Sequence, residues 1–117
     1  MHVLVFEDNL LWSTRLQNSL RSLGHVPEVL TSVPASTDAP LAIVNLGASR
    51  FDPAAVVPTL RALGVFVIGH AGHQEKAVLG AGKEAGCDRL ATNSQITFDL
   101  KKVIELANLP GFEAPPG

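Results

Sequence analysis

Two adjacent acids, Glu7 and Asp8, directly follow the apolar run HVLVF at residues 2–6. Paired carboxylates can hold a divalent cation when further oxygen ligands join them, and they are also favourable at the positive N-terminal end of a helix. A divalent oxygen site favours several anionic ligands, and only these two acids stand at this point of the chain. The residues therefore favour helix capping over a cation site.

Two histidines, His70 and His73, lie in the segment HAGH. Imidazole suits Zn²⁺, and Glu7 or Asp8 could complete such a site. A pH-sensing role would use the same imidazoles. Because an H-x-x-H pair without a clear third ligand is not specific, we predict no metal and no cofactor. The two residues are then loop histidines, one of them placed to cap the next helix.

Five short runs rich in Val, Leu, Ile and Phe predict the strands that position these groups. They are residues 2–6, 27–30, 41–46, 65–69 and 88–92. Three of the runs are continuously apolar rather than alternating, which is typical of parallel strands covered by helices on both faces.

Helical patterns lie between the runs. Residues 10–24 form the clearest one, with Asn9 as its cap and Gly24 at its left-handed end. Its apolar stripe consists of Trp12, Leu16, Leu20 and Leu23. This spacing predicts that Trp12 packs in the core rather than at an interface.

Three further helices are predicted over residues 53–63, 73–85 and 95–109. Pro58 removes one hydrogen bond inside the first of them, so we expect that helix to bend or restart there. Residues 31–40 carry two prolines and four Ser or Thr, which predicts a loop in place of a full helix.

This alternation predicts an α/β fold with a single doubly wound five-stranded parallel sheet. The expected strand order is the flavodoxin-like 2-1-3-4-5, with the second helix shortened or absent. One domain covers residues 1–109, and the proline-rich residues 110–117 are predicted to form a disordered tail. Ligands in such folds bind outside the carboxyl ends of the strands. The polar residues predicted to converge there are Glu7, Asp8, Asn45, His70 and Asn93.

Composition narrows the classes of function. Nine Lys and Arg against 11 Asp and Glu give a net charge of -2, and without a long basic run we expect no direct nucleic-acid partner. The apolar runs are far shorter than the ~20 residues that cross a bilayer, so we expect no membrane partner. The single cysteine, Cys87, cannot form an internal disulfide and is predicted to pack in the core, and we expect a cytoplasmic protein.

Two motifs resemble the receiver domains of two-component response regulators. VLVFEDN at residues 3–9 is similar to the first-strand motif of that family, whose paired acids hold Mg²⁺. GCDRLATN at residues 86–93 is similar to the stretch through the family's fifth strand. The resemblance covers nearly all of residues 2–107.

The resemblance also marks departures from the family. The family's phosphoacceptor aspartate corresponds to Asn45, and its switch Ser or Thr corresponds to His70. The lysine that would pair with the phosphoryl group corresponds to Asn93, and the aromatic switch residue corresponds to Leu90. An amide oxygen is a far poorer nucleophile than a carboxylate, so an acyl phosphate cannot form at Asn45. The resemblance therefore implies a pseudo-receiver with a degenerate phosphoacceptor cleft.

These observations predict a phosphorylation-independent module for protein interaction or dimerisation in signalling, and not an enzyme. The family's usual interaction face implies candidate contacts at Ala77, Val78, Ala81, Arg89, Lys101 and Lys102. The alternative is a small-ligand or divalent-metal sensor that uses the cleft at the carboxyl edge. For the interaction module, the expected partner is another protein or a second copy of the chain.

Overall fold

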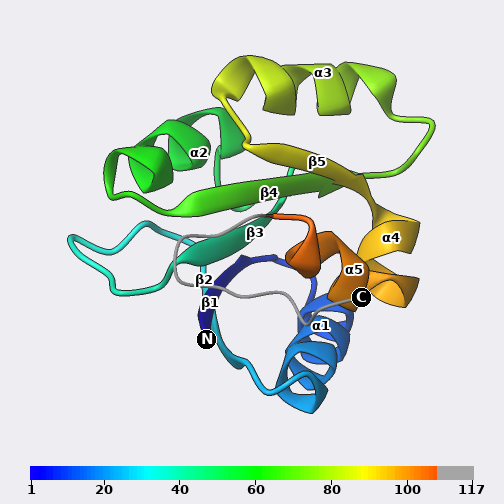
Figure 1. Ribbon diagram of the computed structural model, residues 1–117. Helices are drawn as coiled ribbons and strands as arrows, with labels where there is room; N and C mark the ends of the chain where they lie inside the picture. Colours follow the sequence, from blue (N-terminus) through cyan, green and yellow to red (C-terminus); the bar gives the residue numbers. More distant parts are fainter. Residues whose placement is uncertain (108–117) are drawn as a thin grey trace.

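The computed structural model describes residues 1–107, and they form a five-stranded, fully parallel sheet. The strands are β1 His2–Phe6, β2 Val26–Leu30, β3 Leu41–Asn45, β4 Phe66–Ala71 and β5 Arg89–Thr92. Their order in the sheet is β2-β1-β3-β4-β5, which confirms the predicted doubly wound topology (Figure 1). Because every strand runs the same way, all five carboxyl ends lie at one edge of the sheet.

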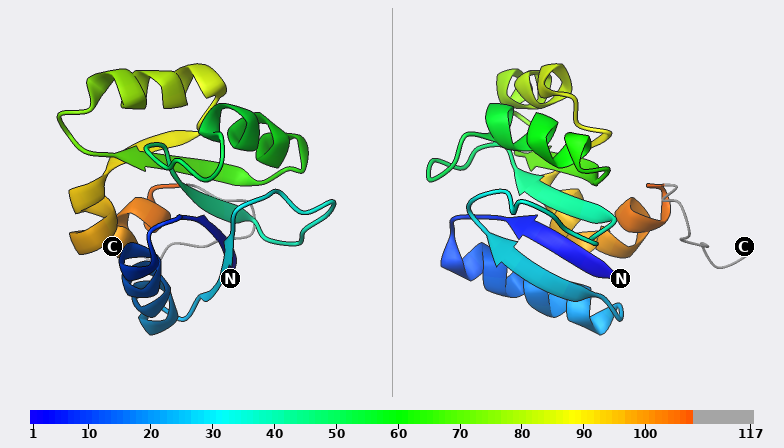
Figure 2. Two further views of the ribbon diagram at one scale, coloured as in Figure 1. Left: turned by 180° about the vertical axis from the view of Figure 1, so that it is seen from behind. Right: turned by 90° about the vertical axis from the view of Figure 1, so that its left-hand side faces the viewer.

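Helices cover both faces of the sheet (Figures 1 and 2). They are α1 Leu10–Ser22, α2 Pro53–Ala62, α3 Lys76–Ala85, α4 Asn93–Phe98 and α5 Leu100–Glu105. Helices α1, α4 and α5 pack on one face with Val3, Val5 and Ile43, whereas α2 and α3 pack on the other. Successive residues of the central strands are thus buried on opposite faces, which explains their continuously apolar sequences.

Residues 31–40 contain no helix or strand, as the composition predicts. The restart expected at Pro58 is wrong, because α2 continues through that residue as one helix. The single closing helix predicted over 95–109 is also wrong over the part that the structure describes. Helix α4 begins at Asn93 and ends before Asp99, whose φ of −125° interrupts the helix before α5. The rest of that prediction and the predicted tail lie outside the described residues.

A capping box explains the early start of α4. The Thr92 hydroxyl accepts a hydrogen bond from Gln95 N at 3.1 Å, and Thr92 N donates to Gln95 Oε1 at 2.8 Å. This reciprocal pair supplies acceptors for two backbone N–H groups, those of Thr92 and Gln95, where β5 ends. Helix α4 therefore begins directly at the carboxyl edge, with no intervening loop.

The predicted burial of Trp12 is wrong. Leu16 and Leu20 are buried, but 42 % of the Trp12 surface is exposed, and the residue in α1 that turns inward near it is Ser13. Leu10 and Leu11 are exposed as well, at 83 % and 69 %. The first turn of α1 extends beyond the sheet edge, so its side chains have no core to pack against. Among residues 1–107, no helix is both long and apolar enough to span a membrane.

Candidate functional site

Strands β1 and β3 are neighbours, with Phe6 in register with Val44, so the residues that follow them meet at the sheet edge. The Asn45 side-chain amide donates to Glu7 Oε2 at 2.8 Å. Asn9 N donates to the same oxygen at 3.3 Å, and Gly47 N donates to Asn45 Oδ1 at 2.9 Å. Glu7 is a buried carboxylate at 6 % exposure, and Asn45 supplies its shortest hydrogen bond.

Asp8 turns to a different segment. Its Oδ2 accepts hydrogen bonds from Ser49 N at 2.8 Å and Arg50 N at 3.0 Å. These bonds, that of Arg50 first, lower the pKa of Asp8. The cap of α1 is Asn9, whose Oδ1 accepts from Trp12 N at 3.1 Å. Asn9 is therefore confirmed as the cap. The interpretation of Glu7 and Asp8 as caps of α1 is wrong, because neither carboxylate accepts a hydrogen bond from a backbone N–H of that helix.

His70 lies inside β4 and is 6 % exposed, so its description as a loop histidine is wrong. Its Nδ1 lies 2.8 Å from Asn93 Oδ1, and burial lowers its pKa. In this amide orientation Nδ1 donates, which leaves Nε2 as an acceptor. Within residues 1–107, Nε2 is buried without a hydrogen-bond partner.

His73 is exposed in the segment that precedes α3. It does not cap that helix, because the capping position is Glu75, which makes no side-chain capping bond. One of the two histidines is thus buried in β4, and the other is exposed in the segment that follows that strand. Across the described chain, no three His, Cys, Asp or Glu side chains come together in an arrangement that could hold a metal ion.

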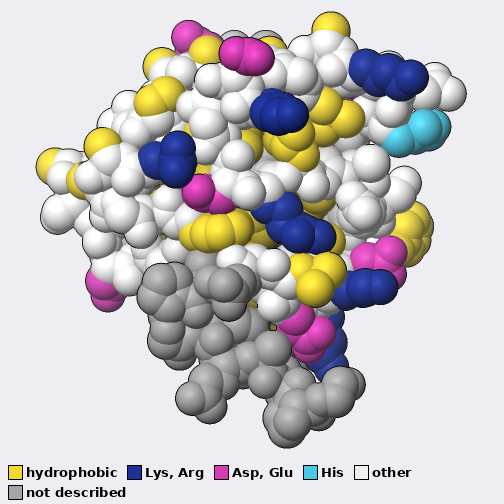
Figure 3. All heavy atoms as spheres, turned by 45° about the horizontal axis from the view of Figure 1, so that its top comes forward, with side chains coloured by type: hydrophobic (Ala, Val, Ile, Leu, Met, Phe, Trp, Pro, Cys, Tyr) yellow, Lys and Arg dark blue, Asp and Glu magenta, His cyan; other side chains and the backbone are white. Residues whose placement is uncertain are grey.

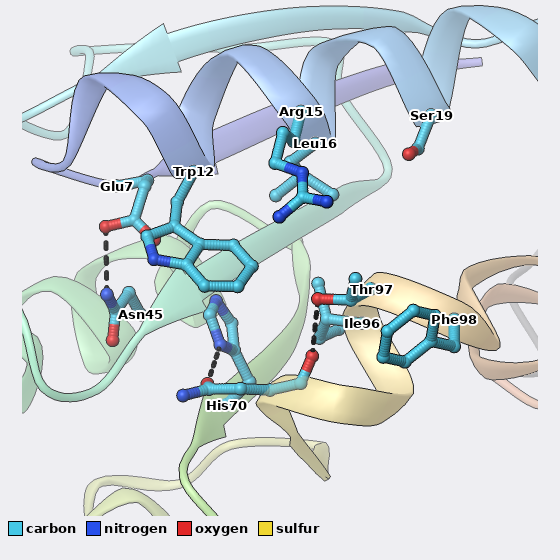
Figure 4. Close-up of a pocket in the computed structure, with 11 residues that line it drawn as sticks. Glu7, Trp12, Arg15, Leu16, Ser19, Asn45, His70, Ile96, Thr97 and Phe98 are labelled. Carbon is cyan, nitrogen blue, oxygen red and sulfur yellow. Dashed lines mark hydrogen bonds between the residues drawn. The ribbon is translucent and has the colours of Figure 1, made fainter.

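A pocket of about 220 Å³ opens between α1, α4 and the carboxyl ends of β1, β3 and β4 (Figure 4). Its lining comprises Glu7, Trp12, Arg15, Leu16, Ser19, Asn45, His70, Asn93, Ile96, Thr97 and Phe98. Sequence reasoning brings four of these together, Glu7, Asn45, His70 and Asn93, and the structure places all four in one lining. Sequence reasoning misses the lining residues of α1 and those of α4 that follow Asn93.

A signal for the missed part is present in the sequence. The pattern T-x-x-Q at residues 92–95 is a capping box, which starts α4 at the sheet edge and brings Ile96, Thr97 and Phe98 to the cleft. For Trp12, position in the apolar stripe is misleading, because the stripe extends past the end of the sheet.

The candidate interface residues lie on α3, on the edge strand β5 and on α5. Helices α3 and α4 contact β5 from opposite faces of the sheet, and α5 follows α4 on the same face as α4. Ala77 and Ala81 are exposed, and with the partly buried Val78 they line a shallow groove against α2. Arg89 belongs to β5, and its Nε is buried without a partner in the described part of the chain. Lys101 and Lys102 are exposed on α5. Figure 3, which brings α3 toward the viewer, shows basic side chains interspersed with apolar atoms.

Cys87 is half-buried between β4 and α3. Burial is the main cause that raises the pKa of its thiol to about 11, so the thiolate is scarce at neutral pH. A Cβ on Gly69 would lie 2.6 Å from its sulfur. These contacts agree with the predicted packing role and with a thiol of low reactivity.

Solved structures of receiver domains share this fold. A two-component response regulator from Clostridium difficile superposes with a TM-score of 0.75 at 11 % identity, covering 92 % of this chain and 94 % of that one. A CheY-like receiver domain protein from Methanospirillum hungatei JF-1 gives 0.73 at 14 % identity over 92 % and 93 % of the two chains.

The signal receiver domain of the putative response regulator NarL from Mycobacterium tuberculosis gives a TM-score of 0.67 at 20 % identity, over 91 % and 94 % of the chains. No protein family model and no curated protein matches the sequence. The chain therefore has the receiver fold, at sequence identities that establish the fold alone.

Proposed function

We propose that this chain is a pseudo-receiver that acts in signalling as a protein-interaction or dimerisation module without being phosphorylated. The observation that carries the proposal is the hydrogen bond from the Asn45 amide to Glu7 at 2.8 Å. A receiver uses a carboxylate at this position as the nucleophile. Here the amide is a poor nucleophile, and its N–H is already committed to the neighbouring acid.

The other cleft positions support the same proposal. His70 stands where a switch hydroxyl would be, Asn93 stands where a lysine would be, and the two side chains bond to each other at 2.8 Å. Neither is a mobile cation or hydroxyl that could follow an incoming phosphoryl group. The Asp8 carboxylate is held by two backbone amides of the segment after β3. Each polar group that would respond to phosphorylation thus has a bond to another part of the cleft.

Intact mass after incubation with acetyl phosphate and Mg²⁺ tests the phosphorylation half of the proposal. The natural chain is expected to keep its mass, and a receiver domain with an intact acceptor aspartate serves as the positive control for the reagent. Asn45→Asp, run in parallel, tests whether restoring the carboxylate restores uptake. A stoichiometric gain of one phosphoryl group by the natural chain would overturn the proposal.

The proposed protein interaction uses the surface formed by α3, β5 and α5. Small exposed residues such as Ala77 and Ala81 permit close approach of a partner helix, and rim charges such as Lys101 set partner choice. For a homodimer, light scattering across a concentration series should show self-association that Ala81→Glu weakens. Ala55→Glu, at an exposed position of α2, is the matched control and should have no effect.

Asn45→Asp should also leave this self-association unchanged, because the cleft is not the contact. A chain that is monomeric at every concentration excludes the homodimer and leaves a different protein as the partner. Self-association that Ala81→Glu and Ala55→Glu weaken equally would contradict the choice of face.

A further inference from the structure

The pocket beside the degenerate cleft has one polar end and one apolar end. Glu7, Asn45, His70 and Asn93 form the polar end, and side chains of α1 and α4 form the rest (Figure 4). Its volume of about 220 Å³ lies below the roughly 300–1,000 Å³ of pockets for drug-sized ligands, so it fits one small ring system with a substituent.

Two hydrogen-bond acceptor atoms at the polar end receive no hydrogen bond from the described residues. Glu7 Oε2 receives both protein hydrogen bonds to that carboxylate, and no described residue donates to Oε1. His70 Nε2 is a buried acceptor with no partner in residues 1–107, and an unpaired buried acceptor destabilises the site until a donor reaches it. His70 Nδ1 lies 2.8 Å from Asn93 Oδ1. In Figure 4 the other edge of the imidazole is turned toward Trp12.

The neighbouring walls are suited to a flat ring. Trp12 from α1 and Ile96 and Phe98 from α4 line the pocket, and 42 % of Trp12 and 80 % of Phe98 are exposed. Aromatic side chains supply large contact area at low conformational cost, and exposed aromatic residues that rim a cavity often mark a binding site. His70 Nε2 has almost no surface of its own, so a ligand must move a wall side chain to reach it, and Trp12 has solvent to move into.

Arg15 determines the charge of the ligand. Its guanidinium carbon lies 5.4 Å from the centre of the Trp12 ring, and the side chain is exposed at the pocket rim. A cationic ligand would meet this charge at the face of the indole, whereas an anionic substituent would pair with it. The ligand must therefore have a ring that donates hydrogen bonds at its buried edge and an anionic substituent at its exposed end.

We infer that the pocket binds a small heteroaromatic base with adjacent ring N–H and amino donors and an anionic substituent, as in a guanine mononucleotide. The ring N–H would donate to Glu7 Oε1 and the amino group to His70 Nε2. The ring would lie against Trp12, with its phosphate at Arg15. This site is separate from the proposed α3–β5–α5 contact and does not depend on the absence of phosphorylation.

Titration of the full chain with GMP, guanosine, IMP and AMP tests the inference by calorimetry and by fluorescence. Trp12 is the only tryptophan, so its emission reports the pocket directly. GMP is expected to bind with 1:1 stoichiometry and to change the emission. IMP lacks the amino donor and should bind about tenfold more weakly, since it leaves the buried His70 acceptor without the hydrogen bond that GMP supplies. AMP presents an acceptor in place of the ring N–H and should not saturate.

Variants assign the two ends of the ligand. Glu7→Gln should weaken GMP at least about tenfold, whereas Glu84→Gln, at an exposed position of α3, should not. Arg15→Gln should weaken GMP a few-fold and leave guanosine unchanged, and Arg21→Gln on the same helix is its control. Because Arg15 is exposed, this variant keeps the test informative even where Glu7→Gln does not fold.

Three results would overturn the inference. The first is that GMP does not bind, and the second is that GMP, IMP and AMP bind equally. The third is that Glu7→Gln binds GMP as the natural chain does. None of them changes the mass after acetyl phosphate treatment, so this inference and the proposed function fail independently.

Discussion

Asn45 Nδ2 and Glu7 Oε2 lie 2.8 Å apart, and the amide proton between them determines the chemistry of this cleft. A carboxylate at position 45 could not donate that proton. It would bring a second negative charge within hydrogen-bonding distance of a buried acid, and like charges at this separation repel strongly. The amide therefore stabilises the cleft in the absence of a cation and removes the nucleophile at the same time.

Asn45→Asp should destabilise the chain at pH 7 in the presence of a chelator. Loss of one hydrogen bond to a charged group, together with the new repulsion, lowers the free energy of unfolding by about 2 kcal/mol. Urea denaturation measures the difference, and Asn18→Asp, at an exposed position of α1, is the control that adds the same charge elsewhere. Mg²⁺ should recover part of the loss in Asn45→Asp and none in Asn18→Asp. An Asn45→Asp variant that is as stable as the natural chain under chelation would contradict this account.

His70 should make the fold sensitive to acid. Burial lowers its pKa in the folded chain, so between that pKa and the unfolded value of about 6.5 the unfolded chain binds the proton and the folded chain does not. Stability is then fully present above about pH 6.5 and falls as the pH drops below it, with a slope of up to about 1.4 kcal/mol per pH unit.

His70→Gln tests this dependence, because Gln can keep a bond to Asn93 and does not titrate. Denaturation curves from pH 5 to pH 7.5 should have a shallower pH slope in this variant than in the natural chain. His73→Gln, at an exposed histidine, should keep the natural slope. Equal slopes in all three proteins would exclude His70 as the titrating group.

His2 should act in the opposite direction. Its two ring nitrogens lie 2.8 Å from Asp38 Oδ1 and from Glu28 Oε1, and these partners, Asp38 first, raise its pKa. The folded chain therefore holds the proton more tightly, and the stabilisation is present below about pH 6.5 and lost as the pH rises through the raised value. His2→Gln should lower stability at pH 6 and have little effect at pH 9.

Asp38→Asn should reproduce that pattern, since Asp38 anchors the loop of residues 31–40 to β1 through the same imidazole. The difference in melting temperature between pH 6 and pH 9, measured for each variant, provides the comparison. A loss that is equal at both pH values would assign His2 a packing role without a charge.

The sheet could be predicted from the sequence because the strands show as local apolar patterns, and because parallel crossovers in such sheets follow a general rule of handedness. Four cleft residues, Glu7, Asn45, His70 and Asn93, could be predicted for the same reason, since each stands where a strand ends. Trp12 could not, because a helical stripe does not show how far the helix extends past the sheet. The break at Asp99 depends on how α4 and α5 each pack on the core, and no single residue type marks it.

Helix α3 offers two glycines with opposite expected responses to the same substitution. A Cβ on Gly80 would meet nothing within 4 Å, so Gly80→Ala should raise the free energy of unfolding by up to about 1 kcal/mol through helix propensity. A Cβ on Gly82 would clash with Leu46 Cδ1. Leu46 is 8 % exposed, and its methyl groups also pack over Gly69, 3.0 Å from where a Cβ on that glycine would lie, so the side chain is packed against both glycines.

Gly82→Ala should therefore lower the free energy of unfolding by about 1–3 kcal/mol, the cost of overpacking a tight contact. Thermal or urea unfolding of the two variants and of the natural chain measures the change in the free energy of unfolding, which should be positive for Gly80→Ala and negative for Gly82→Ala. Leu46→Val shortens the side chain that clashes, so Gly82→Ala should cost less in that background than in the natural one. If Gly82→Ala instead stabilises the chain as Gly80→Ala does, α3 does not pack this closely on Leu46, and the groove that Ala77 and Ala81 line with α2 must have a different shape.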